Sequence, residues 1–222
     1  MTATFFITYI CVVSAISIIV GIFISHVYLG PELKRQMKID ISVKEMEKAE
    51  LKIAYLKKEN GLPDDVGINM ISSVLNVVDC GEDINLKDRA SILKPTNSSR
   101  IEVYHKTNIA DSDKLFDFAH ECGHLINGDK IPTTRPNGQN KEQMELLTDY
   151  TGVAGLLPYT DIKRTLEKAN YSNASIFKRS HTISEISNKY IVDKTVVARR
   201  IKEVLLLEAS GFDGMLNVTQ SD

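Results

Sequence analysis

His120-Glu121-Cys122-Gly123-His124 is the stretch on which the fold and the chemistry of this chain depend. Two histidines four residues apart lie about one turn from each other on one face of a helix, so both imidazoles can reach one metal ion. Glu121, next to the first histidine, can then act as general base toward a water molecule in the same site. Because short strings of this kind arise by chance, the interpretation depends on a surrounding helix and on a third ligand.

The residues around this motif predict the helix that it requires. Asp111 or Ser112 can cap the start of the helix, and Asn127-Gly128-Asp129 can end it. Gly123 is expected to leave space beside the metal. An apolar stripe at helical spacing runs through the segment and consists of Leu115, Phe118, Ala119, Cys122 and Ile126.

A second helix, predicted from Lys141 to about Leu157, supplies acidic side chains that could complete the site. Glu145 and Asp149 are four residues apart and therefore share a face. We interpret Glu145 as the third metal ligand, and Asp149 as the acceptor of a hydrogen bond from the far ring nitrogen of a ligand histidine. Glu142 shares the face but can instead stabilise the helix dipole.

The predicted metal site thus consists of His120, His124 and Glu145, with Glu121 as the catalytic base. Two imidazoles and one carboxylate suit Zn²⁺, and a zinc ion held in this way favours peptide hydrolysis. A donor to the tetrahedral oxyanion is also expected. The sequence leaves five candidates open for that donor: Tyr104, His105, Tyr150, Tyr159 and His181.

Two short runs of strand-forming residues precede the metal-site helix. Ala90–Lys94 and Arg100–His105 flank Pro95–Ser99, a pattern that predicts a hairpin with a five-residue turn. We expect a small antiparallel sheet, and we expect the free edge of the strand before the motif helix to hold an extended peptide. A short helix over Val66–Leu75 and a strand from Val77 are predicted ahead of the hairpin.

The N-terminal segment from Phe5 to Leu29 is almost wholly apolar, and it carries no acidic or basic residue except His26. Such a run is long enough to cross a hydrocarbon core of about 30 Å. No basic residue precedes it and no small-residue cleavage site follows it, so we expect a single-pass membrane anchor and not a secretory signal. Lys34, Arg35 and Lys38 follow the run and place the catalytic part in the cytoplasm.

The composition agrees with that placement. Three cysteines cannot form a disulfide framework, which fits a reducing compartment. A net charge of −2 argues against a protein that coats nucleic acid, and 43% hydrophobic residues are ordinary for a globular domain.

The C-terminal part has the spacing of a helix-turn-helix pair. Helices are expected over Ile183–Tyr190 and Thr195–Leu207, and the second would carry Arg199 and Arg200. Such a pair could bind DNA, or it could pack on the core or dock a protein partner. We favour packing or docking over direct nucleic-acid binding, because Ile191 stands in the turn where glycine is usual.

Three segments taken together resemble the ImmA/IrrE family of metallopeptidases: Phe118-Ala119-His120-Glu121-Cys122-Gly123-His124, Glu145-Leu146-Leu147-Thr148-Asp149 and Leu156-Leu157-Pro158. The resemblance covers about Glu45 to Val204. It implies a cytoplasmic zinc endopeptidase that cleaves a helix-turn-helix repressor and so derepresses mobile-element, prophage or stress genes. By position, it assigns metal binding to His120, His124 and Glu145, and the catalytic base to Glu121.

The chain also departs from the family pattern. Thr148, Thr151 and Gly152 replace the family's Ala, Phe and Ala, and Leu157 replaces a Met. We therefore expect looser packing of the second metal-site helix. Family members carry a helical pair like the C-terminal one as part of the peptidase body.

Together these observations predict an α+β fold with a zincin-like metallopeptidase domain. The expected organisation is a transmembrane helix at 5–29, a helical stalk at 31–60, the zinc peptidase core at 61–158, a helical C-terminal subdomain at 159–210 and a disordered tail at 211–222. The leading hypothesis is a membrane-anchored zinc endopeptidase that cleaves a helix-turn-helix transcriptional repressor. The alternatives are a non-cleaving sensor that sequesters a regulator, and a DNA-binding regulator acting through residues 183–207.

Overall fold

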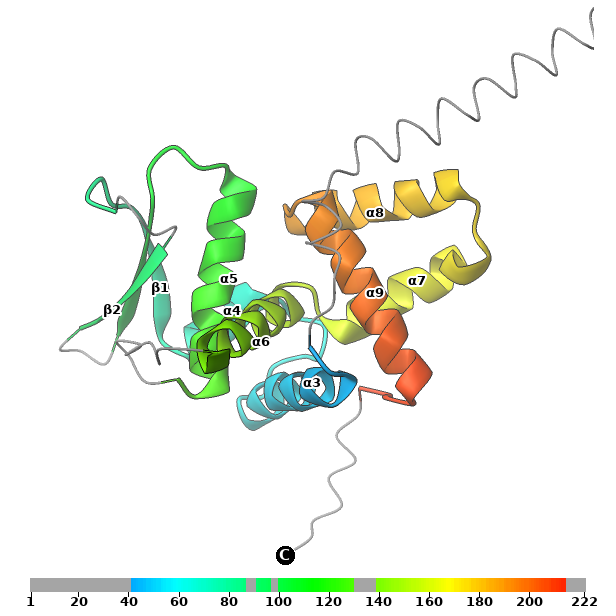
Figure 1. The fold of residues 1–222 in the computed structure, drawn as a ribbon, viewed down its shortest axis with the longest axis horizontal. Helices are drawn as coiled ribbons and strands as arrows, with labels where there is room; N and C mark the ends of the chain where they lie inside the picture. Colours follow the sequence, from blue (N-terminus) through cyan, green and yellow to red (C-terminus); the bar gives the residue numbers. More distant parts are fainter. Residues whose placement is uncertain (1–40, 87–90, 97–99, 130–138, 215–222) are drawn as a thin grey trace, which may run out of the picture. The chain divides into compact units, whose positions relative to one another are not determined.

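The structure is a computed structural model that describes residues 41–86, 91–96, 100–129 and 139–214. This part of the chain contains seven α-helices and a three-stranded sheet (Figure 1). These residues belong to one unit, Ile39–Asp222. The transmembrane helix predicted at 5–29 lies outside the described residues. Within the described ranges, no helix combines the length and the apolar character needed to span a membrane.

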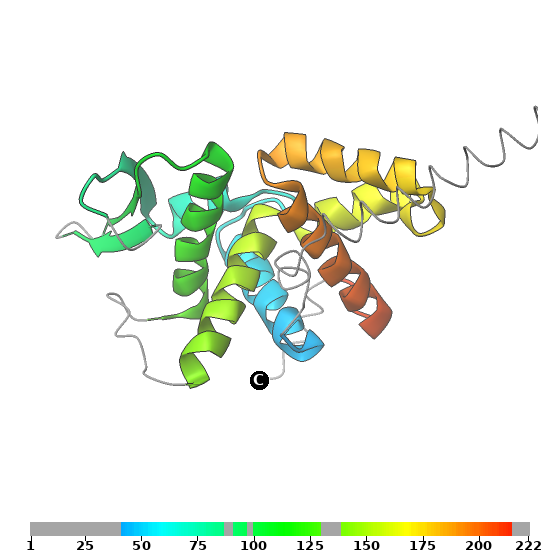
Figure 2. The ribbon, with the colours of Figure 1, turned by 45° about the horizontal axis from the view of Figure 1, so that its top comes forward.

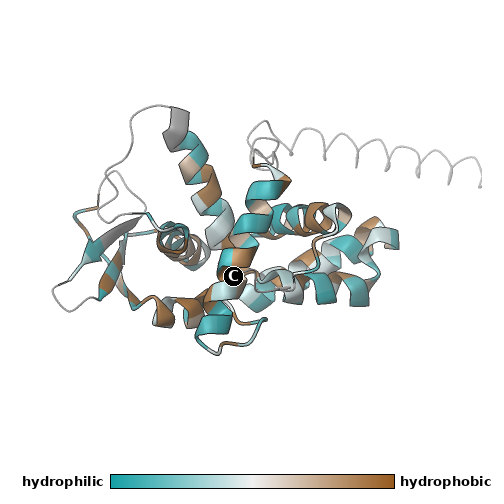
Figure 3. Cartoon of the chain, turned by 90° about the horizontal axis from the view of Figure 1, so that it is seen from below, coloured by the Kyte–Doolittle hydropathy of each residue, from teal (hydrophilic) through white to brown (hydrophobic). Residues whose placement is uncertain are grey.

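The elements follow one another in an order that separates the sheet from most of the helices. They are α3 (Val43–Glu59), α4 (Ile68–Val74), β1 (Val77–Glu82), β2 (Ser91–Pro95), β3 (Ile101–His105), α5 (Asp111–Asn127), α6 (Gln139–Leu156), α7 (Tyr159–Ala169), the 3-10 turn η1 (Tyr171–Asn173), α8 (Ile176–Tyr190) and α9 (Lys194–Ser210). Teal and brown alternate along the helices in Figure 3, as expected for helices that bury one face.

The predicted helix around the metal motif is present as α5. Its N-cap is Ala110, which makes no side-chain cap bond, so neither predicted cap residue has that role. Asp111 and Asp113 instead lie in the first turn, where their negative charges interact favourably with the positive end of the helix dipole. The helix ends as predicted at Gly128, whose φ of 83° is the left-handed conformation that glycine adopts most easily.

The predicted hairpin is present as β2 and β3, but the prediction of an antiparallel sheet is wrong. The strand order is β1-β3-β2, with β3 antiparallel to β2 and parallel to β1. This happens because the second strand of the hairpin inserts between β1 and β2. The strand directly before the motif helix is therefore the central strand and has no free edge. Among the described residues, β1 and β2 each pair on one side only.

Two glycines bring α5 and α6 into close contact. A Cβ on Gly123 would lie 2.6 Å from the carbonyl oxygen of Thr148, and a Cβ on Gly152 would lie 2.6 Å from the carbonyl oxygen of Ala119. The expected role of Gly123, to leave space beside the metal, is thus wrong, because α6 fills that space. The expected looseness of α6 is also wrong, because Gly152 permits a closer approach of the two backbones than alanine would.

Helix α3 packs in the core, although its residues fall in the range predicted as a stalk. It begins with a capping box made by Ser42 and Glu45. Its buried face carries Met46, Ala49 and Ile53 at helical spacing, which is why the helix joins the core and does not lead away from it. Figure 2 shows α6 between α5 and α3, with α9 beyond α3, and each neighbouring pair is in contact.

A buried ion pair connects α3 with the C-terminal helices. Arg200 of α9 is fully buried, and its Nη2 lies 2.7 Å from Oε1 of Glu50 in α3. The same oxygen accepts a hydrogen bond of 2.7 Å from the hydroxyl of Tyr150 in α6. Arg199 pairs with the buried carboxylate of Glu203 at 2.8 Å. The two arginines on which the DNA-binding alternative depended therefore form ion pairs within the chain, and Arg200 is buried.

The C-terminal helices are longer than predicted. Helix α8 begins seven residues before the predicted start, because Ser175 caps it by accepting a hydrogen bond from the backbone N–H of Lys178. After α9, residues 211–214 of the tail predicted to be disordered pack against α7. There the ring of Phe212 meets that of Tyr159 edge-on at 5.1 Å, and the Tyr159 hydroxyl donates to the carbonyl oxygen of Phe212.

Candidate metal centre

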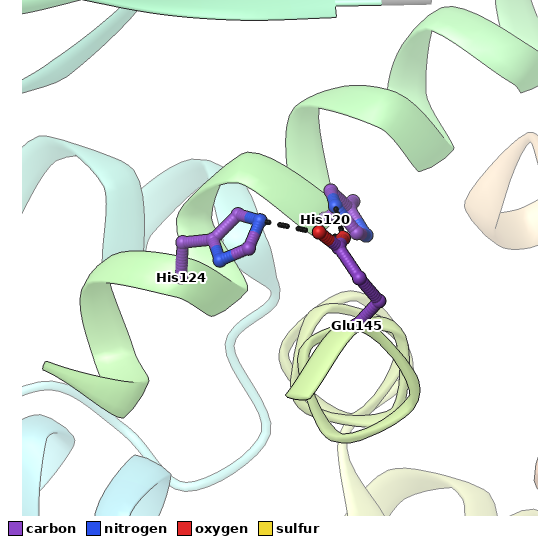
Figure 4. Close-up of side chains that lie close together, drawn as sticks. All are labelled: His120, His124 and Glu145. Carbon is purple, nitrogen blue, oxygen red and sulfur yellow. Dashed lines mark ion pairs between the residues drawn. The ribbon is translucent and has the colours of Figure 1, made fainter. Parts of the chain in front are cut away.

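The three predicted ligands come together from two helices. His120 and His124 project from α5 and Glu145 projects from α6, as Figure 4 shows. The Nε2 atoms of the two imidazoles lie 3.4 and 3.8 Å from the same carboxylate oxygen, Oε2 of Glu145. One ligand atom from each residue lies within 4.8 Å of the other two, a spacing that allows a shared metal ion. In the described residues this is the single such cluster.

A carboxylate holds the far nitrogen of each ligand histidine. Nδ1 of His120 lies 2.7 Å from Oδ1 of Asp149, which is the predicted contact, and Nδ1 of His124 lies 2.8 Å from Oδ2 of Asp129. An imidazole that donates its Nδ1–H to a carboxylate keeps the lone pair on Nε2 for a metal. Both rings are therefore fixed in the tautomer and orientation that a divalent cation needs.

Asp129 was missed from the sequence because only the helix-ending turn brings it back to the site. With Gly128 in the left-handed conformation, the backbone N–H of Asp129 donates to the carbonyl oxygen of His124 at 2.9 Å. This turn places the Asp129 side chain beside the last histidine. An acidic residue directly after a C-terminal glycine, five residues beyond a ligand, is the signal that could have found it.

The charges around the first histidine favour its protonated form when no metal is bound. Burial lowers the pKa of His120, but the hydrogen bond to Asp149 and the carboxylates of Asp149, Glu121 and Glu145 outweigh burial and raise it. One turn earlier on the same helix, burial raises the pKa of Asp117 to about 6, despite the opposing effect of His105 and His120. The site is thus rich in negative charge, which suits a cation.

Of the five candidate oxyanion donors, four have their polar groups bonded elsewhere. The contacts are Tyr104 to Glu102, Tyr150 to Glu50, Tyr159 to the carbonyl of Phe212, and His181 to Glu185. The fifth, His105, is fully buried on β3, the strand that packs on α5, and it also has a carboxylate partner, so the structure selects none of the five as the oxyanion donor. Its Nε2 lies 3.2 Å from Oδ1 of Asp79.

A comparison with protein families agrees with this geometry. The family model described as Peptidase_M78, IrrE N-terminal-like domain, matches residues 82–202, which is more than half of the chain. No curated protein matches the chain. The matched range runs from the end of β1 into α9, so it contains the three candidate ligands, Glu121 and both carboxylates that hold the histidines.

Proposed function

Because the chain belongs to the Peptidase_M78 family of IrrE N-terminal-like metallopeptidases, we propose that it is a membrane-anchored, zinc-dependent endopeptidase that cleaves a helix-turn-helix transcriptional repressor. One observation carries the enzymatic part of the proposal. Both Nε2 atoms converge on one oxygen of Glu145, while Asp149 and Asp129 occupy both Nδ1 atoms. A histidine pair with only a packing role would not need two separate carboxylates to orient it.

The residues present fit a zinc ion and the hydrolysis of a peptide bond. Held by His120, His124 and Glu145, zinc would polarise the peptide carbonyl and lower the pKa of the attacking water. Glu121, which follows His120 on α5, takes a proton from this water as its oxygen bonds to the carbonyl carbon. Glu121 then delivers the proton to the amide nitrogen as the C–N bond breaks, giving a carboxylic acid and an amine.

The sheet offers a place for an extended substrate, although not at the strand first expected. The free edge next to the metal-site helix belongs to β2, which contacts α5 and pairs only with β3 among the described residues. Unpaired backbone N–H and C=O groups on such an edge can pair with an extended polypeptide. This supports a protein substrate with a locally unfolded segment.

The repressor and the membrane location rest on the sequence. The resemblance to the ImmA/IrrE family supports a helix-turn-helix repressor as substrate. The apolar run from Phe5 to Leu29 supports the anchor, and the basic residues after it support a catalytic part in the cytoplasm.

The decisive experiment combines zinc loading with cleavage. The full chain in detergent is incubated with a helix-turn-helix repressor encoded beside its gene, with zinc or with a chelator, and fragments are identified by mass spectrometry. Glu121→Gln should bind zinc with unchanged stoichiometry and cleave at least about 100-fold more slowly. Glu145→Gln should lose zinc, whereas Glu142→Gln on the same helix should behave as the unchanged protein.

Two results would count against the proposal. Cleavage at the normal rate by Glu121→Gln would remove the assigned base. Relief of repression in cells by the same variant, without any cleavage, would show that the protein sequesters its regulator.

A further inference from the structure

The turn between α7 and α8 presents two large apolar side chains to solvent. We call residues Lys168–Arg179 the hairpin tip. Within it, Ile176 and Phe177 follow one another in the first turn of α8 and are 83% and 88% exposed. Single exposed apolar residues are common on protein surfaces, but two adjacent ones at this exposure indicate a contact surface.

The hairpin tip is also positively charged, in a chain whose net charge is −2. It contains Lys168, Lys178 and Arg179 and no acidic residue. The guanidinium of Arg179 donates to the carbonyl oxygens of Tyr171 and Ser172 at 3.0 and 2.6 Å. These bonds tie the start of α8 to the preceding 3-10 turn, so the tip is a defined structure with its apolar pair on the outside.

An aliphatic and an aromatic side chain flanked by basic residues match the boundary between lipid headgroups and acyl chains. We propose that the hairpin tip binds an anionic lipid surface, with Ile176 and Phe177 at the acyl boundary and Lys168 and Lys178 at the headgroup phosphates. This inference rests on the proposed membrane location and not on the peptidase chemistry. Nucleic acid fits less well, because Arg199 and Arg200 of α9 already form ion pairs with Glu203 and Glu50.

The position of the hairpin tip gives this contact a consequence. Figures 1 and 2 show the turn between α7 and α8 on the side of the described unit away from the sheet. A membrane contact through the tip therefore leaves the β2 edge open to a protein substrate. The tip would orient a domain that the N-terminal segment only tethers.

The chain contains no tryptophan, so one substitution creates a specific reporter. Phe177→Trp is made in the full chain, which is reconstituted in vesicles of phosphatidylcholine alone or with phosphatidylglycerol. With the anionic lipid, we expect a blue shift of the tryptophan emission and quenching by lipids brominated on the acyl chain. The control is Tyr55→Trp, at a 57% exposed position on α3, whose emission should remain that of a solvent-exposed tryptophan in both vesicles.

The charge requirement is tested in the same reporter background. Replacing Lys168 and Lys178 by glutamine should lower the association of the tip with the anionic surface about fivefold for each lysine. Arg179 is left unchanged, because its hydrogen bonds hold the turn.

The outcomes separate this proposal from the proposed anchor. If the chain floats with vesicles but Trp emission at position 177 stays solvent-like, the hairpin tip proposal is overturned and the anchor stands. If the chain does not float with vesicles of phosphatidylcholine alone, but vesicles that contain phosphatidylglycerol shift the emission at position 177, the tip proposal is supported and the anchor is rejected. A shift caused by duplex DNA or by a repressor, with none caused by lipid, overturns the tip proposal. Peptide cleavage is measured separately, because the hairpin tip proposal does not depend on the peptidase chemistry.

Discussion

Substituting Gly152 by alanine should weaken both the fold and the metal site. The new Cβ would lie 2.6 Å from the carbonyl oxygen of Ala119, 2.7 Å from its carbonyl carbon and 2.9 Å from the backbone nitrogen of His120. All three atoms are main chain, so no side-chain rotation can relieve the clash. Ordinary contacts of a Cβ begin near 3.4 Å, so α5 and α6 must move apart by several tenths of an ångström.

The size of the effect follows from two opposing contributions. Alanine favours a helix over glycine by about 1 kcal/mol, while overpacking of this kind costs about 1–3 kcal/mol. We expect a net loss of about 1 kcal/mol in the free energy of unfolding. Because the displaced turn carries His120 while α6 carries Glu145, zinc affinity should also fall, by about tenfold.

Gly155 on the same helix provides the matched control. A Cβ there would lie 2.9 Å from Cδ1 of Ile68 and 3.8 Å from Cδ1 of Ile71, and both atoms are the flexible ends of side chains. Gly155→Ala should therefore be near neutral in stability and unchanged in zinc affinity. The assays are urea denaturation of the metal-free protein and zinc competition against a chromogenic chelator. If Gly152→Ala matches Gly155→Ala in both, the argument from the helix crossing is refuted.

Three further predictions concern charged side chains. Asp129→Asn should lower zinc affinity about tenfold with little change in stability, because it weakens the hydrogen bond at Nδ1 of His124. An unchanged zinc affinity would show that Asp129 does not orient this histidine. Burial raises the pKa of Asp117 to about 6, so the folded state keeps a proton that the unfolded state loses above about pH 4. The free energy of unfolding should then fall as pH rises from about 4 to about 6. Asp117→Asn should remove this slope and raise the free energy of unfolding at pH 7 by about 1 kcal/mol, allowing for solvent screening. Urea denaturation curves across that pH range test both expectations. Arg200→Met should cost about 3–5 kcal/mol of unfolding free energy, because it leaves Glu50 buried without its cation, and a loss below 1 kcal/mol would contradict this view of the pair.

The features that could be predicted from the sequence are those in which local spacing determines geometry. The four-residue interval between His120 and His124, and that between Glu145 and Asp149, place each pair on one helix face wherever the helices lie. The hairpin before α5 follows from its turn and its strand-forming residues in the same way.

The features that could not be predicted depend on contacts between distant segments. Nothing near Val77 indicates that β1 pairs in parallel with β3, because that pairing depends on where the intervening hairpin inserts. Gly152 departs from the family pattern in a way that suggested loose packing, and only the opposing backbone at Ala119 shows that it permits closer packing. Asp129 contacts His124 of α5 but lies after the end of that helix, so the helical spacing of the motif does not include it.

The pairing of Arg200 with Glu50 has a consequence for how the chain unfolds. The family match begins at residue 82, yet the counter-ion of a fully buried arginine near its far end comes from residue 50. A fragment limited to the matched range would lack both the carboxylate of Glu50 and helix α3, which contacts α9. The helices before β1 and after α6 should therefore melt together with the metal-binding helices in a single cooperative transition, and thermal denaturation of the full chain should show no separate transition for the residues after 158.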